Sequence, residues 1–182
     1  MTLEEFLEWE RRQDRRWEFD GCLPVPTEDV TIAHALIQAN LIGAVGNRLE
    51  LSPCHILGSQ LRVLVAGSSR YPDAFILCTP KPNHVYDVDD PVVVFEILSP
   101  TTSRTDRIVK TREYGATPSI RRYVLLEQDS IAATVFARHG DDWAAHVVTD
   151  EDTLAIPEVN VSLPLAELYE GLKLSETGSE VG

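Results

Sequence analysis

Two carboxylates lie in the apolar segments of this sequence that are most typical of buried strands. Asp73 opens the segment PDAFIL, and Glu96 interrupts the run VVVFEIL. In a buried strand, an ionised carboxylate costs on the order of several kcal/mol unless an ion pair or a metal compensates it. Neighbouring strands would bring both side chains within reach of one cation, and their hard oxygen ligands suit Mg²⁺ or Mn²⁺. The pair therefore predicts a divalent-metal site.

Each carboxylate also has an ordinary structural explanation. Glu96 could form a salt bridge with an arginine, or it could reach water from an edge position. A Pro-Asp pair such as Pro72-Asp73 is commonly a turn device at the start of a strand. The metal hypothesis depends on both residues being present on neighbouring strands, because neither residue alone decides between the explanations.

Lys110 lies on a helix that we expect over residues 106–114, directly after the Glu96 strand. Asp106 precedes it by four residues, so one interpretation is a surface ion pair that stabilises the helix by about 0.3 kcal/mol. The other is that the ammonium lies near a scissile phosphate, where it would orient water or stabilise charge in the transition state.

The composition describes an ordinary globular chain. The 182 residues are 43% hydrophobic and 25% charged, which predicts one domain over residues 1–174 followed by a polar, disordered tail over 175–182. No apolar run approaches the roughly 20 residues that span a bilayer. The acidic, amphipathic opening MTLEEFLEWERRQ does not have the pattern of a signal peptide. We therefore expect a cytoplasmic protein that does not associate with membranes.

The net charge of −13 is unfavourable for binding a polyanion, since affinity for nucleic acids comes largely from Lys and Arg at phosphates. Basic residues nevertheless form two local clusters. These are Arg11, Arg12, Arg15 and Arg16 near the start, and Arg104, Arg107, Lys110 and Arg112 in the middle. A metal site also concentrates acidic residues, whose charge the bound cation offsets.

The three cysteines, Cys22, Cys54 and Cys78, show no CxxC spacing. An odd number without a pattern argues against a disulfide framework and against a structural zinc site. Buried free thiols are the expected state.

The hydropathy pattern predicts an α/β fold with a mixed sheet. Helices are expected over 3–13 and 30–49, the second with an N-cap from Thr27-Glu28-Asp29, and a short final helix over PLAELYEGL. Hairpins are expected at WEFDGCLPV, with Asp20-Gly21 as a type I′ turn, and around Gly140-Asp141. The absence of a glycine-rich phosphate loop, a GxSxG elbow and an HExxH motif excludes several common enzyme classes.

The ordered motifs resemble the Uma-two-type family of restriction endonucleases, within the PD-(D/E)xK nuclease superfamily. The resemblance covers nearly the whole chain and rests on the segments WEFDGCLP, IAHALI, SQLRV, YPDAFIL, VVVFEILSPTTSRTDRIVKTREY, TPSIRRYVLLEQ and PLAELYEGL. It implies a restriction-endonuclease-like core, a mixed β-sheet flanked by helices with extra β-hairpins. It also implies that Asp73 and Glu96 bind the metal, together with the Ile97 carbonyl.

The resemblance extends to further residues. The superfamily lysine usually follows the Glu by two residues, where this chain has Leu98; the family pattern instead carries a lysine on the following helix, which matches Lys110. Glu18 and His34 match positions typical of the family: Glu18 could accept a hydrogen bond from water or be an exposed strand residue, and His34 could neighbour the site or be a packed or surface residue. The family often has Asp where this chain has Gln60.

These observations lead to a metal-dependent endonuclease that hydrolyses phosphodiester bonds, with DNA as the expected substrate and Mg²⁺ or Mn²⁺ as cofactor. Asp73 and Glu96 would hold the ion and Lys110 would support the attacking or leaving oxygen. An alternative is a nuclease-fold binding module that no longer cleaves, which the acidic pI and Gln60 favour and which predicts no calorimetric metal binding. A third possibility is a hydrolase of small phosphoesters. Exposed hairpins and the habit of the superfamily make a homodimer the expected assembly.

Overall fold

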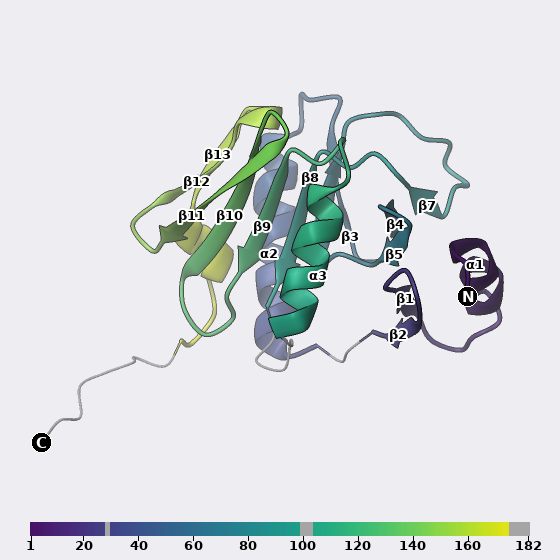
Figure 1. The fold of residues 1–182 in the computed structure, drawn as a ribbon. Helices are drawn as coiled ribbons and strands as arrows, with labels where there is room; N and C mark the ends of the chain where they lie inside the picture. The colour runs from purple at the N-terminus through teal and green to yellow at the C-terminus, as the bar shows by residue number, and fades with distance from the viewer. Residues whose placement is uncertain (28–29, 99–103, 175–182) are drawn as a thin grey trace, which may run out of the picture.

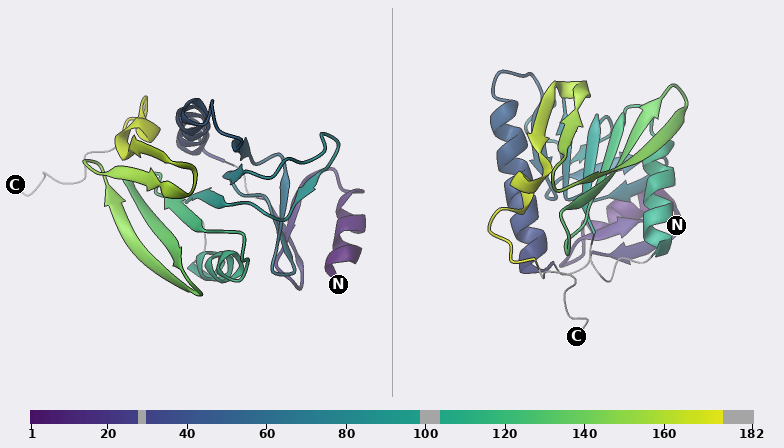
Figure 2. Two further views of the ribbon diagram at one scale, coloured as in Figure 1. Left: turned by 90° about the horizontal axis from the view of Figure 1, so that it is seen from above. Right: turned by 90° about the vertical axis from the view of Figure 1, so that its left-hand side faces the viewer.

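The main β-sheet of this protein has one α-helix packed on each of its two faces. The computed structural model describes residues 1–27, 30–98 and 104–174, within which it contains three α-helices and three sheets. Helices α2 (Ile32–Arg48) and α3 (Arg104–Gly115) lie on opposite faces of the main sheet, as Figures 1 and 2 show. This confirms a mixed α/β fold. No helix in the described ranges is both long and apolar enough to cross a membrane.

The main sheet has six strands in the order β11-β10-β9-β8-β6-β3. In chain order they are β3 (His55–Gly58), β6 (Ala74–Leu77), β8 (Val93–Ile97), β9 (Arg122–Leu126), β10 (Ala132–His139) and β11 (Asp142–Thr149). Strands β8 and β9 run parallel and the other pairs are antiparallel. Every residue of β8 is buried, which confirms the central strand that the apolar run predicted.

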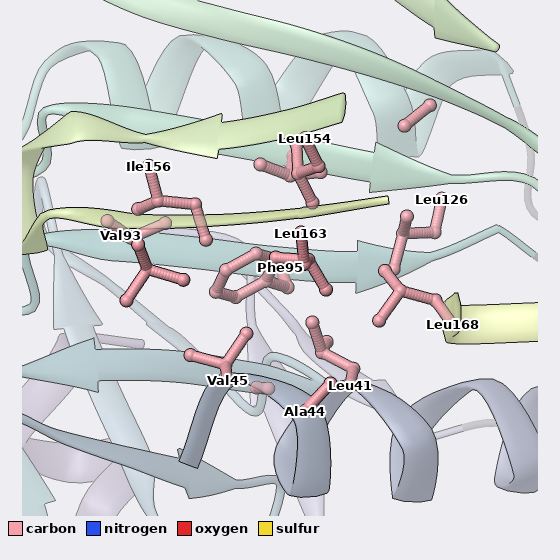
Figure 3. Packing of buried hydrophobic residues seen from close by; sticks show 14 of the residues in the cluster. Leu41, Ala44, Val45, Val93, Phe95, Leu126, Leu154, Ile156, Leu163 and Leu168 are labelled. Carbon is pink, nitrogen blue, oxygen red and sulfur yellow. The ribbon is translucent and has the colours of Figure 1, made fainter. Parts of the chain in front are cut away.

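Alternation along β8 divides its side chains between two apolar cores. Val93, Phe95 and Ile97 pack towards α2 and the small sheet of β12 (Thr153–Ile156) and β13 (Val161–Pro164), as Figure 3 shows in part. Val94 packs on the other side, in the cluster that contains Tyr114 of α3. Because side chains alternate along a strand, Glu96 shares the Val94 face and points towards α3.

A second sheet lies beside the first and carries the N-terminal part of the chain (Figure 2). Its order is β2-β1-β5-β4-β7. Its strands are β1 (Trp17–Phe19), β2 (Pro24–Pro26), β4 (Arg62–Val65), β5 (Ser68–Arg70) and β7 (Asp87–Val88), preceded by α1 (Leu3–Glu10). Helix α1 is shorter than the predicted span over 3–13.

The turns of this sheet differ from the expected ones. Strands β1 and β2 form the predicted hairpin, but four residues connect them, since Phe19 is paired with Pro24. Of the Asp20-Gly21 pair only Gly21 has a positive φ, +88°, and the Asp20 carboxylate instead accepts hydrogen bonds from two backbone amides of the turn. The predicted type I′ turn is therefore wrong at this place. A two-residue turn with positive φ at both positions occurs between β4 and β5, at Ala66-Gly67.

Helix α2 begins later than predicted. Its N-cap is Thr31, whose hydroxyl accepts a hydrogen bond from the backbone N–H of His34 at 3.1 Å. The cap expected at residues 27–29 is wrong, because Val30 and Thr31 still precede the helix; residues 28–29 themselves lie outside the described ranges. Val30, which was expected to begin the helix, precedes it and is exposed.

The C-terminal part contains elements that periodicity did not predict. The β10–β11 hairpin is confirmed, with Gly140-Asp141 as its two-residue connection. The β12–β13 pair was not predicted, and the short 3₁₀ helix η1 (Pro157–Val159) separates its strands. The expected final helix is a 3₁₀ helix, η2 (Leu165–Tyr169), with Leu165 and Leu168 buried. The tail predicted over 175–182 lies outside the described residues.

A disulfide joins Cys54 to Cys78, so the expected free thiols are wrong for these two residues. Antiparallel pairing of His55 with Leu77 places the preceding and following cysteines opposite each other at the end of β3 and β6. Cysteine spacing alone cannot indicate this pairing, because it depends on strand register. Cys22 is a free thiol, but it is exposed rather than buried.

Candidate functional site

Asp73 lies immediately before β6, beside the strand that carries Glu96. One oxygen of its carboxylate accepts a hydrogen bond from the backbone N–H of Ile97 at 2.7 Å, and the other lies 2.8 Å from His34 Nε2. Gln38, one turn further along α2, donates to the Asp73 backbone carbonyl at 2.7 Å. The long helix therefore fixes Asp73 against β8 from one side.

Glu96 is only 8% exposed and receives two polar contacts from α3. Lys110 Nζ lies 3.1 Å from Glu96 Oε1, and the Tyr114 hydroxyl donates to the same oxygen at 2.7 Å. Residues four apart on a helix lie on one face, so α3 presents both groups together. The predicted salt-bridge alternative is thus present in part, but with a lysine rather than an arginine. The side chain of Asp106, the other expected partner of Lys110, lies outside the described part of the chain.

The charge states of this pair follow from burial and neighbouring charges. Burial raises the pKa of Glu96 to about 7; Lys110 opposes this, whereas Asp73 and Glu18 add to it. Burial alone would lower the pKa of Lys110, but the carboxylates of Glu96 and Glu18 raise it above its usual range. Lys110 therefore stays protonated at neutral pH, whereas Glu96 is close to half protonated when no cation is present.

Glu18 reaches the same lysine from β1 of the second sheet. Its Oε1 lies 3.6 Å from Lys110 Nζ and accepts a hydrogen bond from the Tyr71 backbone N–H at 3.0 Å, while Oε2 lies 3.1 Å from Arg70 Nη1. Burial raises the pKa of Glu18, but Lys110 and Arg70 outweigh it and the net shift is downward. Glu18 is buried and ionised, so the alternative of an exposed strand residue is wrong. Lys110 thus bridges carboxylates from both sheets.

A buried ion network behind Lys110 was not predicted. Arg70 of β5 forms two hydrogen bonds with Glu113 of α3, at 2.7 and 2.8 Å, and Ser68 donates to the same carboxylate at 2.7 Å. Glu113 follows Lys110 by three residues, which places it on an adjoining part of the helix surface. The three-residue spacing of Lys110 and Glu113 could be seen in the sequence, but nothing in the sequence indicated that Arg70 is the partner of Glu113.

The donor chemistry of the site fits a hard divalent cation. Asp73 and Glu96 supply carboxylate oxygens. Burial is the main cause of the raised pKa of Glu96 and the charge of Asp73 adds to it, and a bound cation would oppose both effects. Within the described ranges, no group of three or more His, Cys, Asp and Glu side chains is arranged to hold a metal. Two carboxylates suffice for Mg²⁺, which usually keeps several waters and takes further oxygens from a phosphate.

The structure brings together all five residues that the sequence singled out, from five different elements or their ends. They are Glu18, His34, Asp73, Glu96 and Lys110. His34 is buried and in contact with Asp73, so the two interpretations of this residue coincide. Leu98 is a buried apolar residue. The chemical roles of the five residues stay predictions.

The chain is similar in sequence and in fold to known proteins. The model of the Uma2 family, described as "Putative restriction endonuclease", matches residues 3–166. An uncharacterized protein of Synechocystis sp. is 29% identical over 177 residues, which cover 94% of this chain and 93% of that protein. A crystal structure from Anabaena variabilis, titled as a putative nuclease belonging to DUF820, superposes with a TM-score of 0.78 at 17% identity and covers 93% of this chain and 97% of its own. The chain belongs to the Uma2 family.

Proposed function

We propose that this protein is a metal-dependent endonuclease that hydrolyses phosphodiester bonds, with DNA as its substrate. The observation that carries the proposal is the protonated Lys110 ammonium, held 3.1 Å from Glu96 and 3.6 Å from Glu18. Asp73 lies close enough to Glu96 for the two charges to interact. Membership of the Uma2 family and the restriction-endonuclease description of that family support the same chemistry.

The proposed cofactor is Mg²⁺ or Mn²⁺, held by the carboxylates of Asp73 and Glu96. When bound, such an ion activates water and neutralises charge that develops on a phosphate. The residues of the chain prepare the two carboxylates for this role. His34 and the Ile97 amide each engage one oxygen of Asp73, so the carboxylate is fixed before a ligand arrives. The Tyr114 hydroxyl orients Glu96 in the same way.

Lys110 is placed to act on the phosphate itself. An ammonium has three N–H donors, and Glu96 and Glu18 engage at most two of them. The third can donate to a non-bridging or leaving oxygen, whose negative charge grows in the transition state. Glu18, kept ionised by Lys110 and Arg70, can accept a hydrogen bond from the attacking water.

Replacing the Glu96 carboxylate by an amide of the same shape tests the proposal. In an assay with labelled DNA, RNA and a small phosphodiester, Glu96→Gln should lower metal-dependent DNA cleavage by about a hundredfold or more, the usual loss when a group active in the transition state is removed. Glu158→Gln is the matched control, since Glu158 of η1 pairs with Arg122 at the start of β9, away from the site. A Glu96→Gln protein that cuts DNA as fast as wild type contradicts the proposal.

The main rival is a binding module that keeps the nuclease fold without cleavage. The net charge of −13 and a metal site limited to two carboxylates among the described residues favour it. It predicts that the wild-type protein leaves every substrate in this panel uncut. Cleavage of the small phosphodiester alone would instead favour a hydrolase of small phosphoesters.

A further inference from the structure

A cleft beside the candidate site collects arginines from an otherwise acidic chain. It has a volume of about 470 Å³ and is lined by the end of α1, the connection to β1, and parts of the second sheet. Four arginines line it, namely Arg11, Arg15, Arg16 and Arg62, against the two carboxylates of Glu10 and Asp14. This excess of positive charge is local, because the whole chain carries −13.

Internal pairing leaves part of that positive charge available to a ligand. Arg62 is buried and forms ion pairs with both Glu10 and Asp87, so its charge is compensated inside the wall of the cleft and is not available to a ligand. Arg11 and Arg15 are exposed, and neither forms an ion pair with any residue in the described ranges. Arginines without an internal partner, lining a concave surface, suit an anion with several charged groups.

Aromatic rings order two of the guanidinium groups. Arg15 lies over the Trp17 ring at 4.5 Å, and Arg16 lies over the Tyr71 ring at 5.6 Å while donating to the Ser59 carbonyl at 2.8 Å. A stacked guanidinium loses less freedom when it forms a bidentate contact with a phosphate. The ring of Tyr86, also in the lining and 79% exposed, presents an aromatic face to solvent. Exposed aromatic faces among arginines are typical of surfaces that bind nucleic acid strands.

Tyr71 connects this cleft directly to the candidate site. Its side chain lines the cleft, its backbone N–H donates to Glu18 at 3.0 Å, and it precedes Asp73 by two residues. Two residues span at most about 7 Å of chain. Each nucleotide advances a duplex strand by about 3.4 Å along the helix axis, so a strand with its scissile phosphate at Asp73 and Glu96 would reach the cleft within a few nucleotides.

We propose that the cleft binds the phosphodiester backbone of the substrate strand next to the bond to be cut. Arg11 and Arg15 contact phosphates, and Tyr86 stacks on a base where the strand is unpaired. The inference rests on the proposed function in one respect, that the strand continues to Asp73 and Glu96.

Binding can be measured separately from cleavage. Fluorescence anisotropy with labelled single-stranded and duplex DNA, in EDTA, reports affinity with no metal present. The double variant Arg11→Gln/Arg15→Gln should bind at least about tenfold more weakly, and the slope of log K against log salt should fall by about 2, close to one unit per lost phosphate contact. The control Arg12→Gln/Arg121→Gln removes the same charge from exposed arginines outside the lining. Tyr86→Ala should weaken single-stranded binding more than duplex binding.

The control variant Arg12→Gln/Arg121→Gln distinguishes binding in the cleft from a general effect of charge. An equal loss in both double variants overturns the proposal, because it shows an effect of total charge alone. Absence of DNA binding by wild type also overturns the proposal. So does a competition experiment in which polyglutamate displaces the labelled DNA as effectively as unlabelled DNA of equal charge. If wild type binds DNA through the cleft but does not cut it in the presence of Mg²⁺ or Mn²⁺, the proposed function is refuted and the cleft proposal stands. If wild type cuts DNA and the cleft variants bind and cut it equally well, the cleft proposal is refuted and the proposed function stands.

Discussion

At the scale of single residues, Glu96 holds its proton far more tightly than a carboxyl group in water. Burial and the charges of Asp73 and Glu18 raise its pKa from 4.5 to about 7. A group with a raised carboxyl pKa binds more protons in the folded state than in the unfolded state between those two values. The free energy of unfolding of the metal-free protein must therefore contain a term that falls as pH rises from about 4.5 to about 7.

The variant Glu96→Gln removes this term because an amide does not titrate. Between pH 5 and 7 we expect its free energy of unfolding, measured by urea denaturation in EDTA, to decline less steeply than that of wild type. The difference in slope can reach about 1.4 kcal/mol per pH unit. Glu18 does not obscure the result, since its pKa is lowered and its effect falls below this range. Parallel pH profiles for wild type and Glu96→Gln would contradict the assignment, and Glu158→Gln should follow wild type.

Sequence reasoning was strongest for residues that are anomalous where they stand. Glu96 in an apolar strand and Asp73 one strand earlier were identifiable because burying a carboxylate is costly. Arg70 and Glu113 were not, although they are equally buried. Each lies in a polar stretch where a charged residue is ordinary, and only the packing of α3 against β5 brings them together.

At the scale of elements, the Arg70–Glu113 pair joins α3 to the second sheet. Arg70 also contacts Glu18. One guanidinium is therefore linked both to α3, which carries Lys110, and to β1, whose Glu18 contacts Lys110. Its pKa is raised above the usual arginine value, because Glu113 and Glu18 outweigh the effect of burial. The pair fixes where α3 lies and therefore where the Lys110 ammonium lies.

Glu113→Gln should accordingly destabilise the protein by about 3 kcal/mol, the usual cost of removing one partner of a buried ion pair. The comparison variant is Glu167→Gln, whose pair with Arg48 joins η2 to α2 and is about a third exposed on each side. That loss should be below about 1 kcal/mol. Urea denaturation at neutral pH gives both values, and equal losses would show that the buried pair has no special structural role.

Elements with a clear period were predictable, and elements defined by their partners were not. Strand β8 and helix α2 followed from an apolar run and a three-to-four residue repeat. Strand β5 has the sequence SSR and forms because an Ala66-Gly67 turn folds it back on β4. The start of α2 was misplaced because the apolar repeat extends back to Val30, whereas the helix is capped by Thr31.

At the scale of the whole molecule, folding separates charges that the composition averages. The sequence gives a net charge of −13, yet Arg11, Arg15 and Arg16 line one cleft beside the candidate site. The Cys54–Cys78 disulfide is likewise a property of strand register that cysteine spacing did not reveal. Average charge and residue spacing are therefore weak guides to what this protein binds.

The central claim is that Asp73 and Glu96 together form a divalent-cation site. Isothermal titration calorimetry with Mn²⁺ at pH 8, where Glu96 is mostly ionised, tests it most directly. We expect wild type and Glu158→Gln to bind one ion with the same affinity, and Asp73→Asn to bind at least about tenfold more weakly, because one of two charged ligands is lost. Absence of binding by wild type, or equal affinity in Asp73→Asn, would contradict the claim.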